Sequence, residues 1–335
     1  MNKNNLSKIP LCFKNGTLNP EAVKWMSYPF VDCELYGWGR RKKWVYWGIM
    51  SREGTLGITI ADVDYFKLGC VFFATFNNSF SEELGKITFS SKSIHIPNSP
   101  FESATFSNPD LAIEVKVEED KTSIEIDGEI KKKHIHANII ILRDTNYPTL
   151  NVVVPWNNRR FQFTSKQLPF PAIGEVNINN TKLTFSADSS FACLDYGAGK
   201  WKYKTAWNWL AGTTITSSGN ERIAINLGAK WTDNTGQNEN GIWIGNNFKK
   251  INENVTFSWN PKTPEKPWII RSKDVSNIEL ILEPFFIRRS KTNLILLKSE
   301  ITQVFGEIKG TLRVDNDIIT LESAIGWAEE HNARW

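Results

Sequence analysis

Short runs in which apolar and polar residues alternate recur along most of this chain, and they constrain its fold more than any other feature. Residues 113–118 (IEVKVE) and 123–127 (SIEID) alternate on either side of a polar turn, as the two strands of a hairpin do. Similar runs occur at 56–66, 86–89, 134–142, 160–163, 175–178 and 182–185. Gly, Asn, Asp, Ser and Pro separate them. The pattern predicts an all-β sandwich or barrel, and it argues against a doubly wound sheet because no helical rhythm lies between the strands.

Helical signals are few, and the chain is long enough for two domains. Residues 20–25 (PEAVKW) and 207–211 (WNWLA) are each compatible with one short helical turn. Residues 168–174 (LPFPAIG) carry two prolines one residue apart, which resist both helix and central strand, so they predict a linker. We therefore expect two consecutive antiparallel β-barrels, one formed by residues 1–168 and one by residues 169–335.

Composition excludes several classes of function. The chain has 40 Lys plus Arg against 36 Asp plus Glu, and its densest basic runs, RRKK at 40–43 and KKK at 131–133, are too short for a nucleic-acid-binding arm. Its longest apolar runs fall far short of the roughly 18 residues that span a bilayer, which leaves only peripheral contact with a membrane open. The first ten residues lack an apolar signal segment. We predict a cytoplasmic protein that binds no nucleic acid and has no transmembrane segment.

Cysteine and histidine spacing gives no support for a metal site. The four cysteines are far apart and form no Cys-x-x-Cys motif, so in a cytoplasmic chain we expect buried thiols rather than disulfides or a zinc site. His134 and His136 share one strand face, and His95 is a conceivable third ligand. The apolar stripe of the same strand lies on the opposite face, so we expect these histidines to face water and we predict no metal.

A pair of aspartates follows the apolar run at 57–61. If residues 57–66 form one strand, Asp62 and Asp64 share a face with Ile58 and Ile60. Inside a barrel the two carboxylates would repel each other, and one would keep its proton near neutral pH, as a general acid must. The alternative is that the strand has already reached solvent at Asp62.

Tryptophan residues gather in the second half of the chain. Residues 195–209 (DYGAGKWKYKTAWNW) hold one Asp, three Trp, two Tyr and an Asn, a mixture that is typical of a cavity with aromatic walls and few polar anchors. Tryptophan is also common in ordinary cores. Glu239 and Asn240 end a polar loop just before the apolar run IWI at 242–244, although an ordinary turn would have the same composition.

The last eighteen residues, 318–335, fit both a helix and a strand. As a strand, they place an apolar row on one face, and that row ends in a carboxyl and an imidazole. The row consists of Ile319, Leu321, Ile325, Trp327, Glu329 and His331. As a helix, the glutamate and histidine at its end would be routine solvent residues. We favour the strand, partly because Gly326 weakens a helix.

These aromatic-rich segments resemble a known family. Together with residues 35–44 (LYGWGRRKKW), 61–65 (ADVDY), 267–268 (PW), 283–286 (EPFF), 303–306 (QVFG) and 326–331 (GWAEEH), they are similar over nearly the whole chain to the domain-of-unknown-function family 2804. More distantly, GEV at 174–176, KLTF at 182–185, Leu194 with Asp195, and WNW at 207–209 are similar to the second-barrel signature of the carotenoid hydratase and tocopherol cyclase group.

That distant resemblance implies two lipocalin-like barrels packed together. In the relatives, acids inside an apolar barrel protonate or orient a prenyl or polyene substrate without a cofactor, and other relatives bind or carry lipids. Asp195 matches the signature acid by position. This chain has LDYG at 194–197 where those relatives carry a Trp-Met-Asp type of run.

We therefore predict a cofactor-independent, acid-catalysed hydratase, isomerase or cyclase that acts on an apolar unsaturated small molecule. Such a catalyst needs a sequestered acid and aromatic faces that stabilise a developing cation. We expect Asp195 or Glu239 to donate the proton, and Glu329 and His331 to orient the donor or a water molecule. The residues expected to contact the substrate are Arg40, Trp47, Asp64, Trp207, Asn208, Asn240 and Trp327.

Two other functions fit the same residues. A lipid-binding or carrier barrel would have an equally apolar cavity, in which the acids are solvated or structural. A carbohydrate-active enzyme or sugar-binding module would also use Trp beside Asn, Asp and Gln, but in an open, wet cleft.

Overall fold

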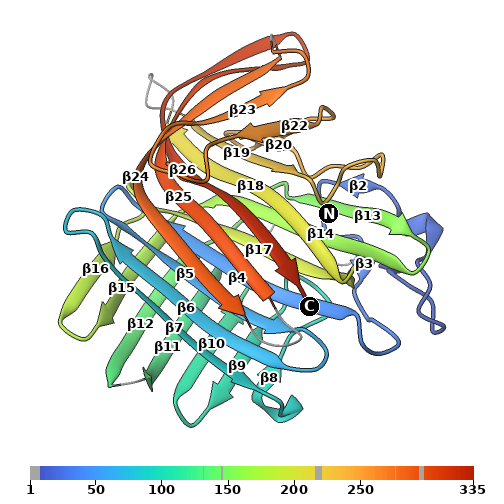
Figure 1. Cartoon of the computed structure of the whole chain (residues 1–335), viewed down its shortest axis with the longest axis vertical. Helices are drawn as coiled ribbons and strands as arrows, with labels where there is room; N and C mark the ends of the chain where they lie inside the picture. Colours follow the sequence, from blue (N-terminus) through green and yellow to red (C-terminus); the bar gives the residue numbers. More distant parts are fainter. Residues whose placement is uncertain (1–7, 131, 145, 216–220, 276, 294–297) are drawn as a thin grey trace. The chain divides into compact units, whose positions relative to one another are not determined.

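The computed structural model describes residues 8–130, 132–144, 146–215, 221–275, 277–293 and 298–335 (Figure 1). The chain divides into two compact units, Met1–Trp201 and Lys202–Trp335. The main sheets are antiparallel, and the helical elements of the described residues are two single 3-10 turns, η2 (Pro20–Ala22) and η3 (Ser91–Ser93). The predicted all-β class is confirmed.

The first unit is built from seventeen strands over its described residues. They are β1 (Ile9–Pro10), β2 (Trp25–Met26), β3 (Val31–Asp32), β4 (Arg41–Met50), β5 (Gly54–Asp62), β6 (Lys67–Thr75), β7 (Phe80–Thr88), β8 (Ile94–His95), β9 (Ala104–Asn108), β10 (Leu111–Val117), β11 (Lys121–Ile130), β12 (Lys133–Leu142), β13 (Leu150–Asn157), β14 (Arg160–Phe170), β15 (Ala172–Ile178), β16 (Thr181–Phe185) and β17 (Phe191–Lys200). One sheet has the order β2-β13-β14-β17-β4-β5-β6-β7, and a second has the order β16-β15-β12-β11-β10-β9-β8. The short strands β1 and β3 pair in parallel.

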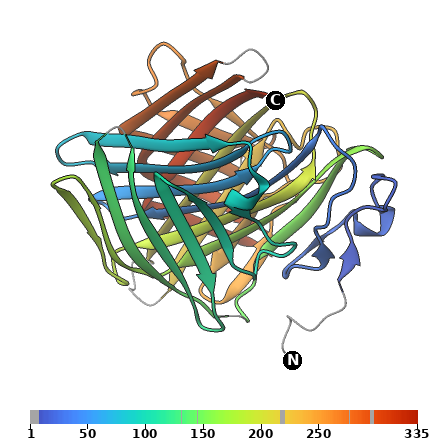
Figure 2. The ribbon, with the colours of Figure 1, turned by 90° about the horizontal axis from the view of Figure 1, so that it is seen from below.

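The core of the first unit lies between its two large sheets. Alternation sends Val45, Trp47 and Ile49 of β4 into this core, and β12 contributes its own alternate apolar residues. Figure 2 shows the green strands of the second sheet crossing the blue strands of the first. Gly69 of β6 makes the close approach possible, because a Cβ atom there would lie only 2.3 Å from the ring of Phe106 on β9.

The second unit contains one curled sheet of nine strands over its described residues. Its strands are β18 (Lys204–Ile215), β19 (Arg222–Ala229), β20 (Gly241–Ile244), β21 (Asn247–Lys250), β22 (Val255–Ser258), β23 (Trp268–Ser272), β24 (Ile278–Asn293), β25 (Lys298–Val314) and β26 (Asp317–Arg334). Their order is β21-β20-β19-β18-β26-β25-β24-β23-β22, and the long orange and red strands β24 to β26 form its centre (Figure 1). One face of this sheet forms the apolar core of the unit.

Several local predictions are confirmed. The alternating runs at 113–118 and 123–127 form the hairpin β10–β11. His134 and His136 are exposed on β12, while the apolar residues of the opposite face are buried, namely Ile135, Ala137, Ile139 and Ile141. The C-terminal segment is the strand β26 rather than a helix. Because side chains alternate between the two faces of a strand, every second residue of β26 lies on the same face.

Other local predictions are wrong. Residues 207–211 do not form a helical turn, because they lie within β18, where cross-strand pairing on both sides satisfies the backbone. The expected linker at 168–174 is the end of β14 and the start of β15. Both prolines are accommodated where pairing is interrupted: the register of β14 shifts between Gln167 and Phe170, and Pro171 lies between the strands. The chain divides into its two compact units after Trp201, and the assignment of residues 1–168 and 169–335 to two separate barrels stays a prediction.

Membrane-spanning helices and metal-binding clusters are absent from the residues that the structure describes. No helix among the described residues is long and apolar enough to cross a membrane. Within the same residues, no group of three or more His, Cys, Asp or Glu side chains is arranged to hold a metal ion. The four cysteines are free thiols, and three of them, Cys12, Cys33 and Cys193, are buried.

Candidate active site on one face of the C-terminal sheet

Four of the predicted tryptophans and acids lie on one face of the second unit, namely Trp207, Trp327, Glu239 and Glu329. Cross-strand partners in an antiparallel sheet point to the same side, so the register decides this. Trp207 of β18 pairs with His331 of β26, and Trp209 pairs with Glu329. Glu329 in turn pairs with Gln303 of β25. We call this face, opposite the apolar core of the unit, the aromatic face.

Glu329 is a buried carboxylate with a donor on each oxygen. The indole Nε1 of Trp207 donates to Oε1 at 2.9 Å, and the amide Nε2 of Gln303 donates to Oε2 at 3.1 Å. Gln303 is oriented by Arg288, whose Nη1 donates to its Oε1 at 3.0 Å. The carboxylate is only 6% exposed. These contacts fix its position and provide the hydrogen bonds that a buried charge requires.

His331 lies against Trp207, with 4.1 Å between the ring centroids. Its Nε2 is 2.7 Å from the hydroxyl of Ser299, and among the described residues its Nδ1 has no hydrogen-bond partner. Burial, and secondarily the charge of Arg288, lower the pKa of His331 from 6.5 to about 3. The imidazole is therefore neutral at physiological pH, with one nitrogen able to donate and the other able to accept.

The floor of the aromatic face consists of packed rings. Trp209 and Trp327 meet edge to face at 5.4 Å, and Phe305 lies 6.4 Å from Trp327. The indole N–H of Trp209 donates to Oδ1 of Asn226 at 2.7 Å. Both indoles are almost fully buried. Their ring faces carry the negative quadrupole that attracts a positive charge.

Glu239 stands on the same face, beside Trp209. It precedes β20, and its carboxylate lies over Gly228, where a Cβ atom would come within 2.1 Å of Oε1. Gly228 is the cross-strand partner of Trp209, so this carboxylate points to the aromatic face. Trp231 donates its indole N–H to Oε1 at 2.7 Å, and Glu239 is 2% exposed.

Asparagines and a lysine surround the Glu239 turn. Asn240 accepts from the N–H of Gly228 at 2.8 Å and donates to the carbonyl of Glu253 at 2.7 Å, so it fixes the backbone. Lys250 donates to the side chain of Asn238. Burial lowers the pKa of Lys250 from 10.5 to about 7, and the attraction of Glu239 opposes this shift. Glu239 thus has a nearby group that exchanges protons near neutral pH.

Asn208 lies on the opposite face from Glu329. It is paired with Glu330, and its Nδ2 donates to the Glu330 carboxylate at 3.3 Å. The same carboxylate accepts from Trp259 at 2.9 Å and pairs with Lys230 at 2.8 Å. Burial acts to raise the pKa of Glu330, but the donors Lys230, Trp259 and Asn208 outweigh it and lower the pKa. Asn208 therefore supports a partly exposed polar cluster on the side of the sheet opposite the aromatic face.

Asp195 belongs to the first unit, on β17. Its carboxylate forms an ion pair with Lys166 at 3.1 Å and accepts from the hydroxyl of Thr164 at 3.0 Å. The Lys166 side chain is only 4% exposed. Trp47 pairs with Leu194 and points into the core, so it lies on the opposite face of the sheet from Asp195.

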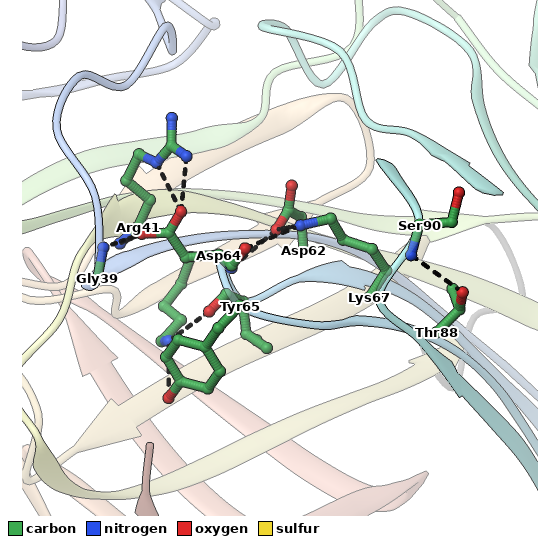
Figure 3. Close-up of polar contacts among 10 residues, drawn as sticks. Gly39, Arg41, Asp62, Asp64, Tyr65, Lys67, Thr88 and Ser90 are labelled. Atoms are coloured by element: carbon green, nitrogen blue, oxygen red, sulfur yellow. Dashed lines mark hydrogen bonds and ion pairs between the residues drawn. The ribbon is translucent and has the colours of Figure 1, made fainter. Parts of the chain in front are cut away.

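The two aspartates at the end of β5 do not face each other in a barrel interior (Figure 3). The strand ends at Asp62, whose carboxylate binds Lys67 at 2.8 Å. Asp64 sits in a turn with a positive φ of 79° and receives Arg41 at 2.6 Å, together with the N–H of Gly39. Each carboxylate is thus neutralised by its own cation, and the predicted shared-proton pair does not form. Arg40, beside Arg41, accepts a backbone hydrogen bond from Trp201.

A buried lysine lies next to this turn. Lys42 is fully buried, its Nζ donates to the carbonyl of Val63 at 2.9 Å, and it lies 4.5 Å from the ring centre of Tyr65. Burial lowers its pKa from 10.5 to about 8, against the attraction of Asp64.

Residues 3–335 match the family described as "Domain of unknown function (DUF2804)". The chain belongs to this family. The family predicted from the aromatic-rich segments is therefore confirmed. No curated protein matches the chain in sequence.

Solved structures that resemble this DUF2804 protein share its fold at low identity. Kievitone hydratase from Nectria haematococca is 11% identical, with 98% of each chain covered and a TM-score of 0.52. CghA, solved with Sch210972, is 10% identical, with 88% of each chain covered and a TM-score of 0.52. A protein assigned as AttH from Nitrosomonas europaea is 10% identical over 87% of this chain and 92% of its own, with a TM-score of 0.50. These likenesses concern the fold, which is lipocalin-like as the resemblance implied.

Sequence reasoning missed several residues of this DUF2804 protein that hold the candidate groups in place. Gln303 and Ser299 contact Glu329 and His331 from β25, and Lys166 pairs with Asp195 from β14. Gln303 did have a signal, because it opens the family segment QVFG at 303–306. The others gave none, since cross-strand partners are not encoded by local spacing.

Proposed function

We propose that this protein is a cofactor-independent enzyme that moves protons on a hydrophobic, unsaturated small molecule, as a hydratase, isomerase or cyclase does. The observation that carries the proposal is the buried Glu329 carboxylate, held by Trp207 and Gln303 on a face floored with indole rings. The fold likeness to kievitone hydratase supports the same class of chemistry.

Glu239 is the proton donor in this proposal, and Glu329 is the base. Of the two acids considered from the sequence, Asp195 is ion-paired with Lys166, whereas Glu239 lies on the aromatic face with Glu329. Gly228, beneath Glu239, and Glu329 belong to strands on either side of β18. At about 4.8 Å between neighbouring strands, their backbones are roughly 10 Å apart, which suits protonation at one end of a substrate and proton removal or water activation at the other.

His331 acts as a neutral polarising group. Because its pKa is about 3, it approaches the substrate as imidazole and not as imidazolium. With Nε2 engaged by Ser299, its Nδ1 is the nitrogen that contacts a carbonyl, a hydroxyl or the attacking water. Trp207 keeps the ring in place through a close, tilted ring contact.

Trp209 and Trp327 stabilise the charge that develops when a double bond is protonated. A carbocation over an indole face gains about 0.5–2 kcal/mol, with the larger value where water is excluded. Both indoles are buried, at 4% and 1% exposure. The same apolar floor selects a hydrophobic substrate.

Isotope incorporation tests the proposal across a panel of candidate substrates. Purified protein is incubated in H2(18)O and in D2O with prenylated phenols, polyenes and unsaturated ketones, and the products are analysed by mass spectrometry. A hydratase incorporates solvent oxygen, whereas an isomerase or cyclase incorporates only solvent hydrogen. For any compound that is turned over, Glu239→Gln and Glu329→Gln should each lower the rate by about 10²-fold or more.

Glu322→Gln is the matched control, because Glu322 is an exposed carboxylate on the same strand as Glu329. Its rate should equal that of the wild type. Folded Glu239→Gln and Glu329→Gln variants that both keep full turnover would contradict the proposal.

Native mass spectrometry addresses the carrier alternative. A lipid carrier retains a co-purified apolar ligand and incorporates no isotope into it. The sugar-binding alternative is less well supported, because the Asn208 and Asn240 amides already bond to protein groups. The cytoplasmic location stays a prediction.

A further inference from the structure

Three loops of the first unit meet at Lys200, the last residue of β17. The carbonyl of Gly16 accepts from Lys200 Nζ at 3.0 Å, and a Cβ atom on Gly37 would lie 3.2 Å from the same nitrogen. The third loop joins β13 to β14, and its Asn158 carbonyl accepts from the N–H of Leu18 at 2.8 Å. Figure 1 shows the dark blue loops and the tip of the green β13–β14 hairpin at the same end of the unit.

Two of these loops carry exposed aromatic side chains. Trp38 is 76% exposed, and Phe13 is 46% exposed. Neither side chain has a hydrogen bond or ring contact with any described residue. Trp38 is flanked by Gly37 and Gly39, both with positive φ, and the N–H of Gly39 is anchored by Asp64. The tip that presents the indole is thus held by the fold.

Cations surround the base of the same loops. Lys14, Arg40, Arg159, Arg160 and Lys200 gather there, and the carboxylates of Glu34, which is bonded to Tyr36, and Asp32 lie nearby. The side chains of Arg159, Arg160 and Lys200 form no ion pair with any described carboxylate.

The cations of this cluster affect one another. Burial, followed by the charges of Arg40 and Arg159, lowers the pKa of Arg160. Burial also lowers the pKa of Lys200, and Arg160, Arg159 and Arg41 act in the same direction. An external anion would relieve this repulsion.

We infer that this end of the first unit docks on the surface of an anionic lipid bilayer, with Trp38 and Phe13 entering the interfacial region and the arginines contacting lipid phosphates. Indole rings prefer the headgroup level, and each Lys or Arg near an anionic surface adds about fivefold to binding. The Phe13 side chain has no polar atom that would need to stay hydrogen-bonded to water, so it is suited to the hydrocarbon region of the bilayer. Nucleic acid is less well matched, because it stacks on successive rings along a groove and these two rings stand on separate loop tips.

Vesicle co-sedimentation tests this inference independently of any catalytic activity. The full-length protein is mixed with vesicles of pure phosphatidylcholine and with vesicles of equimolar phosphatidylcholine and phosphatidylglycerol. We expect binding to the anionic vesicles only, weakened by added salt. Arg159→Gln should lower the partition coefficient about fivefold, and the double variant Phe13→Ala/Trp38→Ala about tenfold or more.

Matched controls distinguish binding through this surface from non-specific binding through any exposed aromatic or cationic side chain. Phe89→Ala removes an aromatic ring that is 83% exposed elsewhere in the unit, and Lys262→Gln removes an exposed cation of the other unit. Both should bind like the wild type. The inference is overturned if the loop variants bind as well as these controls, if binding ignores phosphatidylglycerol, or if a single-stranded oligonucleotide binds at the same loops more tightly than vesicles.

Discussion

Trp207 reaches diagonally past its own cross-strand partner to bond Glu329. Its partner in the β18–β26 register is His331, yet its indole N–H donates to Oε1 of Glu329 at 2.9 Å. Because the His331 ring lies 4.1 Å from the same indole, one side chain positions both a carboxylate and an imidazole. The candidate site therefore depends on a residue that has no acid–base chemistry of its own.

Removal of this indole N–H should destabilise the protein through Glu329. A double-mutant cycle with Trp207→Phe and Glu329→Gln should give a coupling energy of about 1.5–3 kcal/mol, the range for hydrogen bonds to a charged group. Urea unfolding of the four proteins measures it. In the same series with Glu322→Gln in place of Glu329→Gln, the coupling should be close to zero. A coupling near zero for the Glu329 pair would contradict the contact.

Acid should destabilise the protein through His331. Its pKa is lowered on folding from 6.5 to about 3. Below pH 6.5 the unfolded chain therefore binds a proton that the folded chain does not bind until the pH approaches 3. The contribution is fully present above pH 6.5 and is lost as the pH falls toward 3, with a slope of at most about 1.4 kcal/mol per pH unit. His331→Gln should flatten the stability profile in this window.

Urea unfolding of the wild type and of His331→Gln between about pH 7 and pH 4 measures this slope. If His331→Gln and the wild type show parallel profiles there, His331 is not held neutral by the fold.

Alkaline pH should stabilise the protein through Lys250. Its pKa is lowered on folding from 10.5 to about 7, so between these values the unfolded chain binds a proton that the folded chain lacks. Stability attributable to Lys250 therefore rises as the pH increases from 7 to 10.5. Lys250→Met should remove this rise, whereas Lys266→Met, at an exposed position, should retain it. Guanidinium unfolding at a series of pH values measures the difference, and matching profiles for Lys250→Met and the wild type would exclude the effect.

Gly228 should tolerate no side chain. A Cβ atom would lie 2.1 Å from Oε1 and 2.6 Å from Cγ of Glu239, so Gly228→Ala must displace that carboxylate. We expect a loss of about 1–3 kcal/mol in unfolding free energy, as for overpacking. Gly85→Ala is the control, because its nearest contact would be an ordinary 3.6 Å. Equal thermal stability of the two variants would show that Glu239 does not rest on Gly228.

The sequence did predict which residues of the last strand share a face. Alternation along 327–331 predicted that Trp327, Glu329 and His331 share a face, and β26 confirms it. The same rule would have separated Asn208 from Trp207, but residues 207–211 fitted a helical turn, whose period assigns no such faces. The periodicity of a segment therefore predicts which side chains share a face only when the segment has been correctly identified as a helix or a strand.

Contacts between strands distant in sequence could not be predicted. Gln303 meets Glu329 because β25 and β26 pair in one particular register, which no spacing encodes. Lys42 was hidden for another reason. It belongs to the RRKK run at 40–43, which has the composition of a solvated segment, yet β4 turns its side chain into protein, where Val63 and Tyr65 receive it.

The ion pair between Lys166 and Asp195 decides whether Asp195 is structural or catalytic. Asp195→Asn alone leaves the ammonium of Lys166 buried without its counter-charge, which should cost about 3–5 kcal/mol in unfolding free energy. The double variant Lys166→Met/Asp195→Asn removes both charges, so it should recover most of that loss. Because Glu239 and Glu329 lie on the other unit and supply the proton transfers in our proposal, the double variant should also turn over an identified substrate at close to the wild-type rate. A double variant that is as stable as the wild type but inactive in the isotope assay would instead return the role of proton donor to Asp195.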